Sequence, residues 1–156
     1  MNRSMQAELK QRKPFALPQE ELFLSLVRTV DLLGRRSADL LKTHDLSPPQ
    51  YNVMRILRGA GEEGLPCGEI STRMVTRDPD ITRLLDRLEK RDLVIRSRDK
   101  SDRRVITTRI TKSGLGMLSQ LDMPVLDVHR LQLGHLSRKD IDLLLQHLES
   151  IREKMG

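Results

Sequence analysis

The sequence is poor in aromatic residues, which make up 2% of its 156 positions, and it contains no tryptophan. Proteins that hold single-stranded nucleic acids use aromatic side chains to stack bases, so this composition argues against that class of partner. The single cysteine, Cys67, excludes an internal disulfide framework and is typical of a reducing compartment. There is no apolar run long enough to span a membrane and no signal-peptide pattern. We therefore expect a cytoplasmic protein with no membrane partner.

Catalytic motifs are also missing. The sequence has no nucleophile elbow, no phosphate-binding glycine loop and no His-Glu-x-x-His. The four histidines lack paired ligand spacing and have no second cysteine beside them, so we expect neither a metal nor a cofactor. Cys67 precedes a predicted helix, where backbone N–H groups can lower a thiol pKa, but a structural role is favoured over a redox one. The sequence thus contains no sign of a catalytic site.

Positive charge is what the sequence has in excess. Its 28 lysines and arginines outnumber 22 acidic residues, giving a net charge of +6, and many of the cations fall within residues 96–109. A basic cluster of this kind is typical of a surface that binds a polyanion. The cluster belongs to a stretch from Thr76 to Thr111, around which the rest of the chain is organised.

This stretch begins with a helix of two unlike faces. Apolar residues recur at helical spacing on one side (Ile81, Leu84, Leu85 and Leu88). The opposite side carries Arg83, Asp86 and Lys90, flanked by Thr82 and Arg87. A solvated face held by Asp80–Arg83 and Asp86–Lys90 pairs is the simpler interpretation, but each such pair contributes only about 0.2–0.5 kcal/mol.

The boundaries of the stretch also carry signals. Asp78 followed by Pro79 predicts the start of the helix, with a side-chain acceptor and then a preset φ. The β-branched runs 93–95 and 105–108 predict a hairpin whose tip, residues 98–104, is rich in cations. A polar helix face beside such a hairpin can meet a DNA duplex at a groove and at the neighbouring backbone.

The segments on either side of this stretch are predicted to be helices. Residues 17–44 carry an apolar stripe on a helix of roughly 40 Å, which is too long for a small core to cover, so we expect part of it to face another subunit. Ser47 and Gln50 predict a capping box, and residues 68–75 predict a short helix three residues before Pro79, the spacing of a helix-turn-helix. Residues from 113 to the C-terminus predict further helices, which we expect to pack with the first and to pair across a two-fold axis.

Several of these segments resemble the MarR family of winged-helix transcriptional regulators. The resemblance covers residues 46–115 and rests on LSPPQYNVMRIL, CGEISTRMV, ITRLLDRLEKRDLVIR, DRR and ITKSG, in family order. Asp92 stands where the family often has glycine, at a position that favours a left-handed backbone. The implied fold is mainly α with a small β-wing: a winged helix-turn-helix DNA-binding lobe, plus a helical dimerisation region from both chain ends. The expected units are a flexible basic tail (1–16), an N-terminal dimerisation helix (17–45), the DNA-binding domain (46–112) and C-terminal dimerisation helices (113–156).

The resemblance also implies roles for residues. Thr82 and Arg83 are expected to read base edges, and an arginine of the wing, Arg104, to enter a minor groove, whose negative potential favours guanidinium groups. The wing aspartate, Asp102, is expected to brace the wing through Arg96. The full set expected on DNA is Arg77, Thr82, Arg83, Arg87, Arg98, Lys100, Arg103 and Arg104.

The function implied is that of a homodimeric regulator, most simply a repressor, bound to double-stranded DNA at a pseudo-palindromic operator in the cytoplasm and nucleoid of a bacterium or archaeon. Relatives often bind phenolic or other amphipathic ligands where the dimer helices meet the DNA-binding lobe; here that junction would include His44, Tyr51, Met54 and Arg55. Ordinary packing is the alternative for this junction. The competing interpretation of the whole is a winged-helix protein-interaction module without specific DNA binding.

Overall fold

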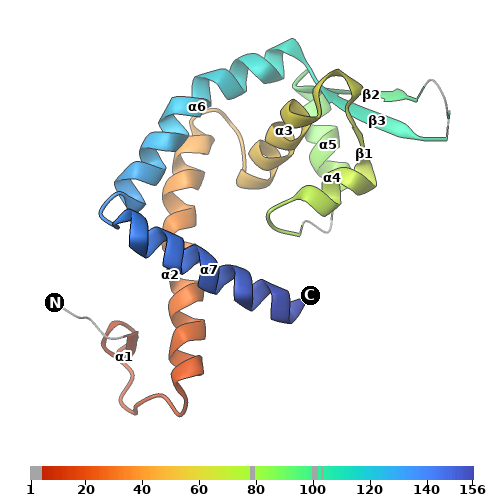
Figure 1. Ribbon diagram of the computed structural model, residues 1–156. Helices are drawn as coiled ribbons and strands as arrows, with labels where there is room; N and C mark the ends of the chain where they lie inside the picture. Colours follow the sequence, from red (N-terminus) through yellow and green to blue (C-terminus); the bar gives the residue numbers. More distant parts are fainter. Residues whose placement is uncertain (1–4, 78–79, 100–101, 103) are drawn as a thin grey trace.

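The winged lobe and a long helical arm make up the molecule (Figure 1). The computed structural model describes residues 5–77, 80–99, 102 and 104–156. In chain order the elements are α1 (Met5–Glu8), α2 (Pro18–Lys42), α3 (Pro48–Ala60), the 3-10 turn η1 (Gly61–Glu63), β1 (Leu65–Pro66), α4 (Cys67–Arg73), α5 (Ile81–Lys90), β2 (Val94–Arg98), β3 (Ile106–Ile110), α6 (Lys112–Leu133) and α7 (Arg138–Met155). The winged lobe comprises α3, α4, α5, the sheet and the first half of α6, and the arm comprises α2, the second half of α6 and α7. The predicted class, mainly helical with a small β-wing, is confirmed.

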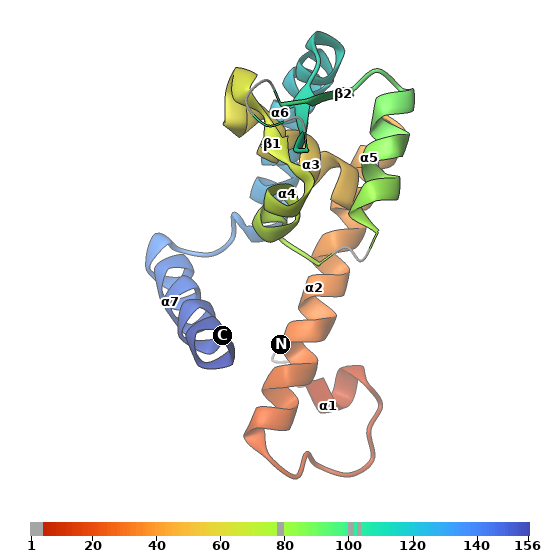
Figure 2. The ribbon, with the colours of Figure 1, turned by 90° about the vertical axis from the view of Figure 1, so that its right-hand side faces the viewer.

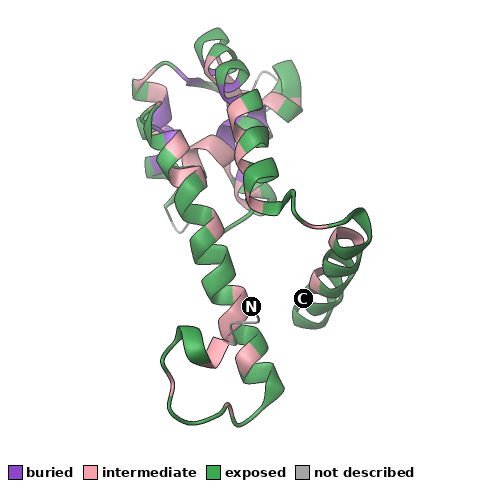
Figure 3. Ribbon diagram, turned by 90° about the vertical axis from the view of Figure 1, so that its left-hand side faces the viewer, coloured by how far each residue is buried: buried purple, intermediate pink, exposed green. Residues whose placement is uncertain are grey.

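The hydrophobic core sits in the winged lobe, where the buried residues gather (Figure 3). It is built from α3, α4, α5, the sheet, the first half of α6 and the end of α2, which contributes Leu41. Its fully buried large side chains are Val53, Met54, Leu57, Ile70, Leu85, Leu88, Val94, Leu118 and Leu121. The apolar stripes predicted for α3 and α5 therefore do face the same core.

The sheet is antiparallel with strand order β1-β3-β2. The wing strands pair from Val94 with Ile110 to Arg98 with Ile106, as a hairpin. The sequence did not predict β1, a strand of only two residues that pairs Leu65 with Thr108. So short a strand, with a proline in it, has no periodicity to detect.

Side-chain caps mark the starts of α3, α5, α6 and α7. The capping box of α3 is confirmed in both directions, because Ser47 accepts from the N–H of Gln50 and the Gln50 side chain accepts from the N–H of Ser47. Ser137 likewise caps α7. Asp92 has φ +54°, as its place after α5 predicts.

The start of α5 differs from the prediction. The N-cap is Asp80, whose side chain accepts from the N–H of Arg83 at 3.2 Å. The expected cap residues Asp78 and Pro79 lie outside the described residues. The connection from α4 to α5 spans residues 74–80 rather than three residues, because α4 ends at Arg73 and α5 begins two residues beyond Pro79.

The arm helices α2 and α7 expose their apolar faces to solvent. α2, described in full, buries only Leu41, and α7, also described in full, buries no residue. α6 packs on α2, with the Gln132 amide donating to the carbonyl of Leu33 at 2.9 Å. α7 instead stands away from α2 (Figures 2 and 3), so the predicted packing of the two chain ends holds for α6 but not for α7 within one chain. The exposed apolar residues of the two helices include Leu22, Phe23, Val27, Val30, Leu143, Leu144, Leu145 and Ile151.

The N-terminal segment folds back on the arm. A tail was expected over residues 1–16, but residues 5–8 form α1, which contacts α2. Glu8 pairs with Arg28 of α2 at 3.4 Å.

Candidate nucleic-acid interface

Helix α5 has one face buried in the core and one face exposed to solvent. Leu84, Leu85 and Leu88 are buried in the core. Thr82 and Arg83 are consequently exposed, with 77% of the Arg83 side chain open to solvent. The pair expected between Arg83 and Asp80 is present at 3.3 Å, which leaves the guanidinium on the surface at the N-terminal end of the helix.

Arg87 is the next cation along the exposed side of α5, one turn after Arg83. The two arginines line a notch of about 170 Å³ together with Ser47 and Gln50 at the start of α3. Arg77, in the connection before α5, is also exposed. The predicted cations of α5 and of the connection before it therefore all face solvent, from Arg77 ahead of the helix to Arg87 in its last turn.

The wing is braced to α5 by Arg96, but not in the predicted way. The expected partner was Asp102; instead the Arg96 guanidinium donates to Glu89 at 2.5 and 3.0 Å and to Asp86 at 2.6 Å. The backbone N–H of Arg96 donates to Glu89 as well, at 3.0 Å. Arg96 lies in β2, against α5, and Asp86 accepts from it rather than forming the expected pair with Lys90. The orientation of the wing relative to α5 is thus fixed by side chains of the helix itself.

The contact between Arg96 and Glu89 also changes the pKa of Glu89. The hydrogen bonds from Arg96 hold the pKa of the Glu89 carboxyl below its ordinary value. The brace is therefore complete at neutral pH, where Glu89 is ionised.

The tip of the wing holds the remaining predicted cations. Arg98 and Arg104 are exposed. Asp102 has a local role, accepting the backbone N–H of Arg104 at 3.0 Å while its own N–H donates to Asp99 at 3.2 Å. Lys100 and Arg103, also predicted to contact DNA, lie outside the described residues.

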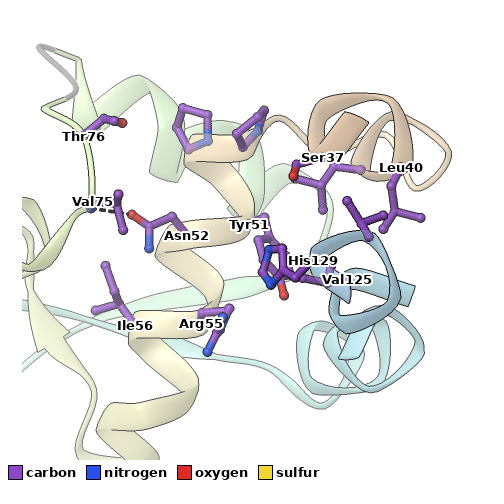
Figure 4. A pocket seen from close by; sticks show the side chains of 14 residues that line it. Ser37, Leu40, Tyr51, Asn52, Arg55, Ile56, Val75, Thr76, Val125 and His129 are labelled. Carbon is purple, nitrogen blue, oxygen red and sulfur yellow. Dashed lines mark hydrogen bonds between the residues drawn. The ribbon is translucent and has the colours of Figure 1, made fainter. Parts of the chain in front are cut away.

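The connection before α5 is tied to α3 by Asn52, a residue that the sequence analysis missed. The Asn52 side-chain oxygen accepts from the backbone N–H of Val75 at 2.8 Å (Figure 4). Val75 as a whole residue is 86% exposed. A single asparagine within an amphipathic helix gives no local signal for such a contact, 23 residues away in the chain.

A cavity of about 540 Å³ lies beside this contact, between α2, α3, α6 and the α4–α5 connection. Figure 4 shows side chains from these elements converging on it: Ser37, Leu40, Tyr51, Asn52, Arg55, Ile56, Val75, Thr76, Val125 and His129. The Arg55 guanidinium lies 6.0 Å from the centre of the Tyr51 ring. The lining is mostly apolar, with a cation, an imidazole and a phenol among it.

Two of the four residues predicted for a ligand site are at this cavity and two are not. Tyr51 and Arg55 line it. Met54 is fully buried in the core, because it falls on the opposite side of α3. His44 lies outside the lining; its ring Nδ1 is 2.9 Å from the Thr43 hydroxyl. His129 was missed because α6 is brought to α3 only by the tertiary fold.

The lobe is joined to α6 by an ion pair between Arg58 and Asp122. The two terminal guanidinium nitrogens of Arg58 donate to the two carboxylate oxygens of Asp122, each at 2.9 Å. These hydrogen bonds hold the pKa of Asp122 below its ordinary value. The pair fixes α3 on the helix that continues into the arm.

Other kinds of site gain no support. The described part of the chain contains no group of three or more His, Cys, Asp or Glu side chains that could hold a metal ion. Cys67 is a half-buried free thiol at the start of α4. Within the described ranges, no helix has the length and apolar character needed to cross a membrane.

A helix-turn-helix followed by a two-stranded wing, with the exposed arginines on the helix and the wing, defines a winged-helix DNA-binding protein. Residues 46–106 match the model of the MarR family. The chain is 31% identical over 138 residues to the HTH-type transcriptional regulator TtmR of Methylorubrum extorquens, an alignment covering 86% of this chain and 67% of TtmR. The chain belongs to the MarR family and is a DNA-binding transcriptional regulator, not an enzyme.

Solved structures agree with this assignment. The crystal structure of a MarR transcription factor from Planctomyces limnophilus is 38% identical, with a TM-score of 0.67, over 88% of this chain and 98% of that one. The organohalide-sensing regulator RdhR in its 2,4-dichlorophenol-bound form shares the fold at 18% identity, with a TM-score of 0.80, over 92% and 87% of the two chains.

Proposed function

We propose that this regulator is a homodimeric repressor that binds a pseudo-palindromic operator in the cytoplasm and nucleoid of a bacterial or archaeal cell. One observation carries the proposal: the exposed cationic face of α5 and the cationic wing are held together as one unit by the Arg96 brace. A unit of this kind can place a helix in a major groove and a hairpin on the neighbouring minor groove.

Each residue predicted to contact DNA has a role in this proposal. Thr82 and Arg83, at the N-terminal end of α5, contact base edges, and a bidentate arginine–guanine contact discriminates by about 1–3 kcal/mol. Arg77 and Arg87 lie to the sides and contact phosphates. Arg104 enters the minor groove. Arg98, Lys100 and Arg103 add to the positive potential of the wing.

The arm supplies the dimer. α7 buries nothing within its own chain, and α2 presents exposed Phe23, Val27 and Val30. Exposed apolar faces on two helices are what a two-fold interface would cover. The dimer would set the two copies of α5 roughly 34 Å apart, one turn of DNA, so that they meet successive major grooves.

Charge reversal separates this proposal from the competing one, a winged-helix module that binds proteins. We expect Arg83→Glu and Arg104→Glu to abolish binding to an operator selected from random duplex DNA while the dimer stays intact. The control is Arg130→Glu, the same charge change on α6, which should bind normally. Measured affinity should also fall steeply with salt, because each neutralised phosphate releases counterions. Equal affinity for operator and scrambled DNA would refute specific regulation.

We also propose that the cavity takes a small aromatic ligand with an anionic or phenolic group. The apolar lining from Leu40, Ile56 and Val125 suits a ring, while Arg55 and His129 suit a negative or polar substituent. RdhR, which shares the fold, has been solved with 2,4-dichlorophenol bound. The hydrogen bond from Val75 to Asn52 borders the cavity, so a ligand that displaces Asn52 would release the connection that leads into α5.

A ligand regulates only if it prefers the form that cannot bind DNA. We expect 2,4-dichlorophenol, used as a probe, to raise the melting temperature of the free protein and to weaken its operator affinity. Arg55→Met should reduce both effects. A rise in melting temperature with unchanged DNA affinity would refute release by the ligand.

A further inference from the structure

The C-terminal end of the recognition helix carries an arginine with no assigned role. α5 ends at Lys90, and Arg91 is its C-cap residue. The half-buried Arg91 side chain turns away from the helix, and its two terminal nitrogens donate to backbone carbonyls: Nη1 to Asp45 at 2.5 Å and Nη2 to His44 at 3.0 Å. These carbonyls lie 46 and 47 residues earlier in the chain.

The carbonyls belong to the turn that ends the arm helix. α2 stops at Lys42, and Asp45 takes a left-handed conformation with φ +53° that redirects the chain into α3. The last carbonyls of α2 accept from the N–H groups of this turn, as Leu41 does from His44 and Lys42 from Asp45. The carbonyls of His44 and Asp45, just beyond the helix, accept from Arg91, close to the partial negative charge at the helix end. A guanidinium group is suited to this place, because it has a permanent positive charge and a fork of donors that can bridge two acceptors.

The contact joins two parts of the molecule with different tasks. α2 is the long helix of the arm, and α5 carries the exposed Thr82 and Arg83. α3 lies beside α5 in Figures 1 and 2 and connects to α2 through the turn that Arg91 holds. The turn that follows the arm helix is therefore attached directly to the C-cap residue of α5.

We propose that Arg91 is a positioning residue for DNA recognition: it transmits the placement of the dimer arm to the recognition helix without touching DNA. With Arg91 in place, a movement of the end of α2 is passed to α5, and the angle of α5 in the groove is set by the arm. This inference rests on the proposed operator binding, since only a helix that reads bases needs a fixed angle.

Three variants test the role of Arg91. Arg91→Met removes the charge and the fork. Arg91→Lys keeps the charge but cannot bridge both carbonyls as the planar guanidinium does. Lys90→Met is the matched control, because it removes one positive charge from the exposed neighbouring residue. Each variant is first checked for an unchanged dimer mass and helical circular dichroism.

Affinity is then measured for the selected operator and for scrambled duplex across a salt series. For Arg91→Met and Arg91→Lys we expect the ratio of specific to non-specific affinity to fall roughly tenfold, as for the loss of charge-assisted hydrogen bonds. The slope of affinity against salt should stay at the wild-type value, because no phosphate contact is lost. Lys90→Met should keep the wild-type ratio.

Several outcomes would overturn the inference. If Arg91→Lys keeps the wild-type ratio, the charge and not the bridge is what matters. If Arg91→Met lowers the salt slope by about 0.9, the arginine is itself a phosphate ligand. If Arg91→Met does not fold, the result for Arg91→Lys decides alone. If the unsubstituted protein binds no duplex preferentially, the proposed function fails, and this inference fails with it.

Discussion

Replacing Gly64 with alanine should loosen the attachment of the wing to the lobe. Gly64 lies just before β1, with φ +69° and ψ −166°. A Cβ built there would lie 2.3 Å from the carbonyl oxygen of Thr108 and 2.6 Å from Cγ of Arg109, both in β3. The backbone oxygen cannot move aside alone, so β1 and β3 would have to separate.

The destabilisation expected for Gly64→Ala has two parts, which can be measured separately. A side chain in this backbone region costs about 1–3 kcal/mol. Overpacking against a fixed neighbour costs roughly another 1–3 kcal/mol. Gly61, with φ +67° and ψ −150°, has the same kind of backbone but no atom within 4 Å of a built Cβ. Gly61→Ala should therefore show the first cost alone, and Gly64→Ala the sum of both.

Urea denaturation gives the two free energies of unfolding. The protomer concentration is held fixed, because the proposed subunit association would contribute to stability. We expect Gly64→Ala to lose at least about 1 kcal/mol more than Gly61→Ala, from the overpacking cost. Equal losses for the two variants would show that β3 does not constrain this position, and the close approach of β1 and β3 would have to be rejected.

Three further perturbations test other contacts. The pKa of Glu89 is lowered in the folded state, so ionised Glu89 contributes stability at pH values above its ordinary pKa. This contribution is lost as the pH falls through the pKa of the folded state. Arg96→Met should remove this part of the acid dependence, measured as a pH series of denaturation curves. Asn52→Leu should speed hydrogen exchange at the Val75 amide by tenfold or so, whereas Asn52→Asp, which keeps an acceptor oxygen, should leave it protected. Leu145→Asp, on the exposed face of α7, should yield monomers by sedimentation; an intact dimer would place the interface elsewhere.

The elements that could be predicted are those whose signals are local. The stripes of α3 and α5, the capping box at Ser47 and the left-handed residue Asp92 depend on neighbours within one or two turns. The hairpin followed likewise from β-branched runs on either side of a polar tip. Such signals can be read from a single sequence because the groups that interact are close along the chain.

The misplaced features depend on contacts between distant residues. The partner of Arg96 could not be chosen from sequence, because three carboxylates (Asp86, Glu89 and Asp102) lie within ten residues of it along the chain. Only the packing of β2 on α5 selects the first two. Similarly, the histidine that lines the cavity is His129 and not the predicted His44. His129 lies on α6, which is brought next to α3 only in the folded chain.

The exposed apolar face of α7 affects how promoter occupancy depends on the concentration of the protein in the cell. If the arms pair as proposed, the operator-binding species forms in proportion to the square of the protomer concentration whenever the protein is scarce. Promoter occupancy would then rise more steeply with protein level than for a one-chain binder, so that a modest change in synthesis or degradation would be enough to turn the regulated genes on or off.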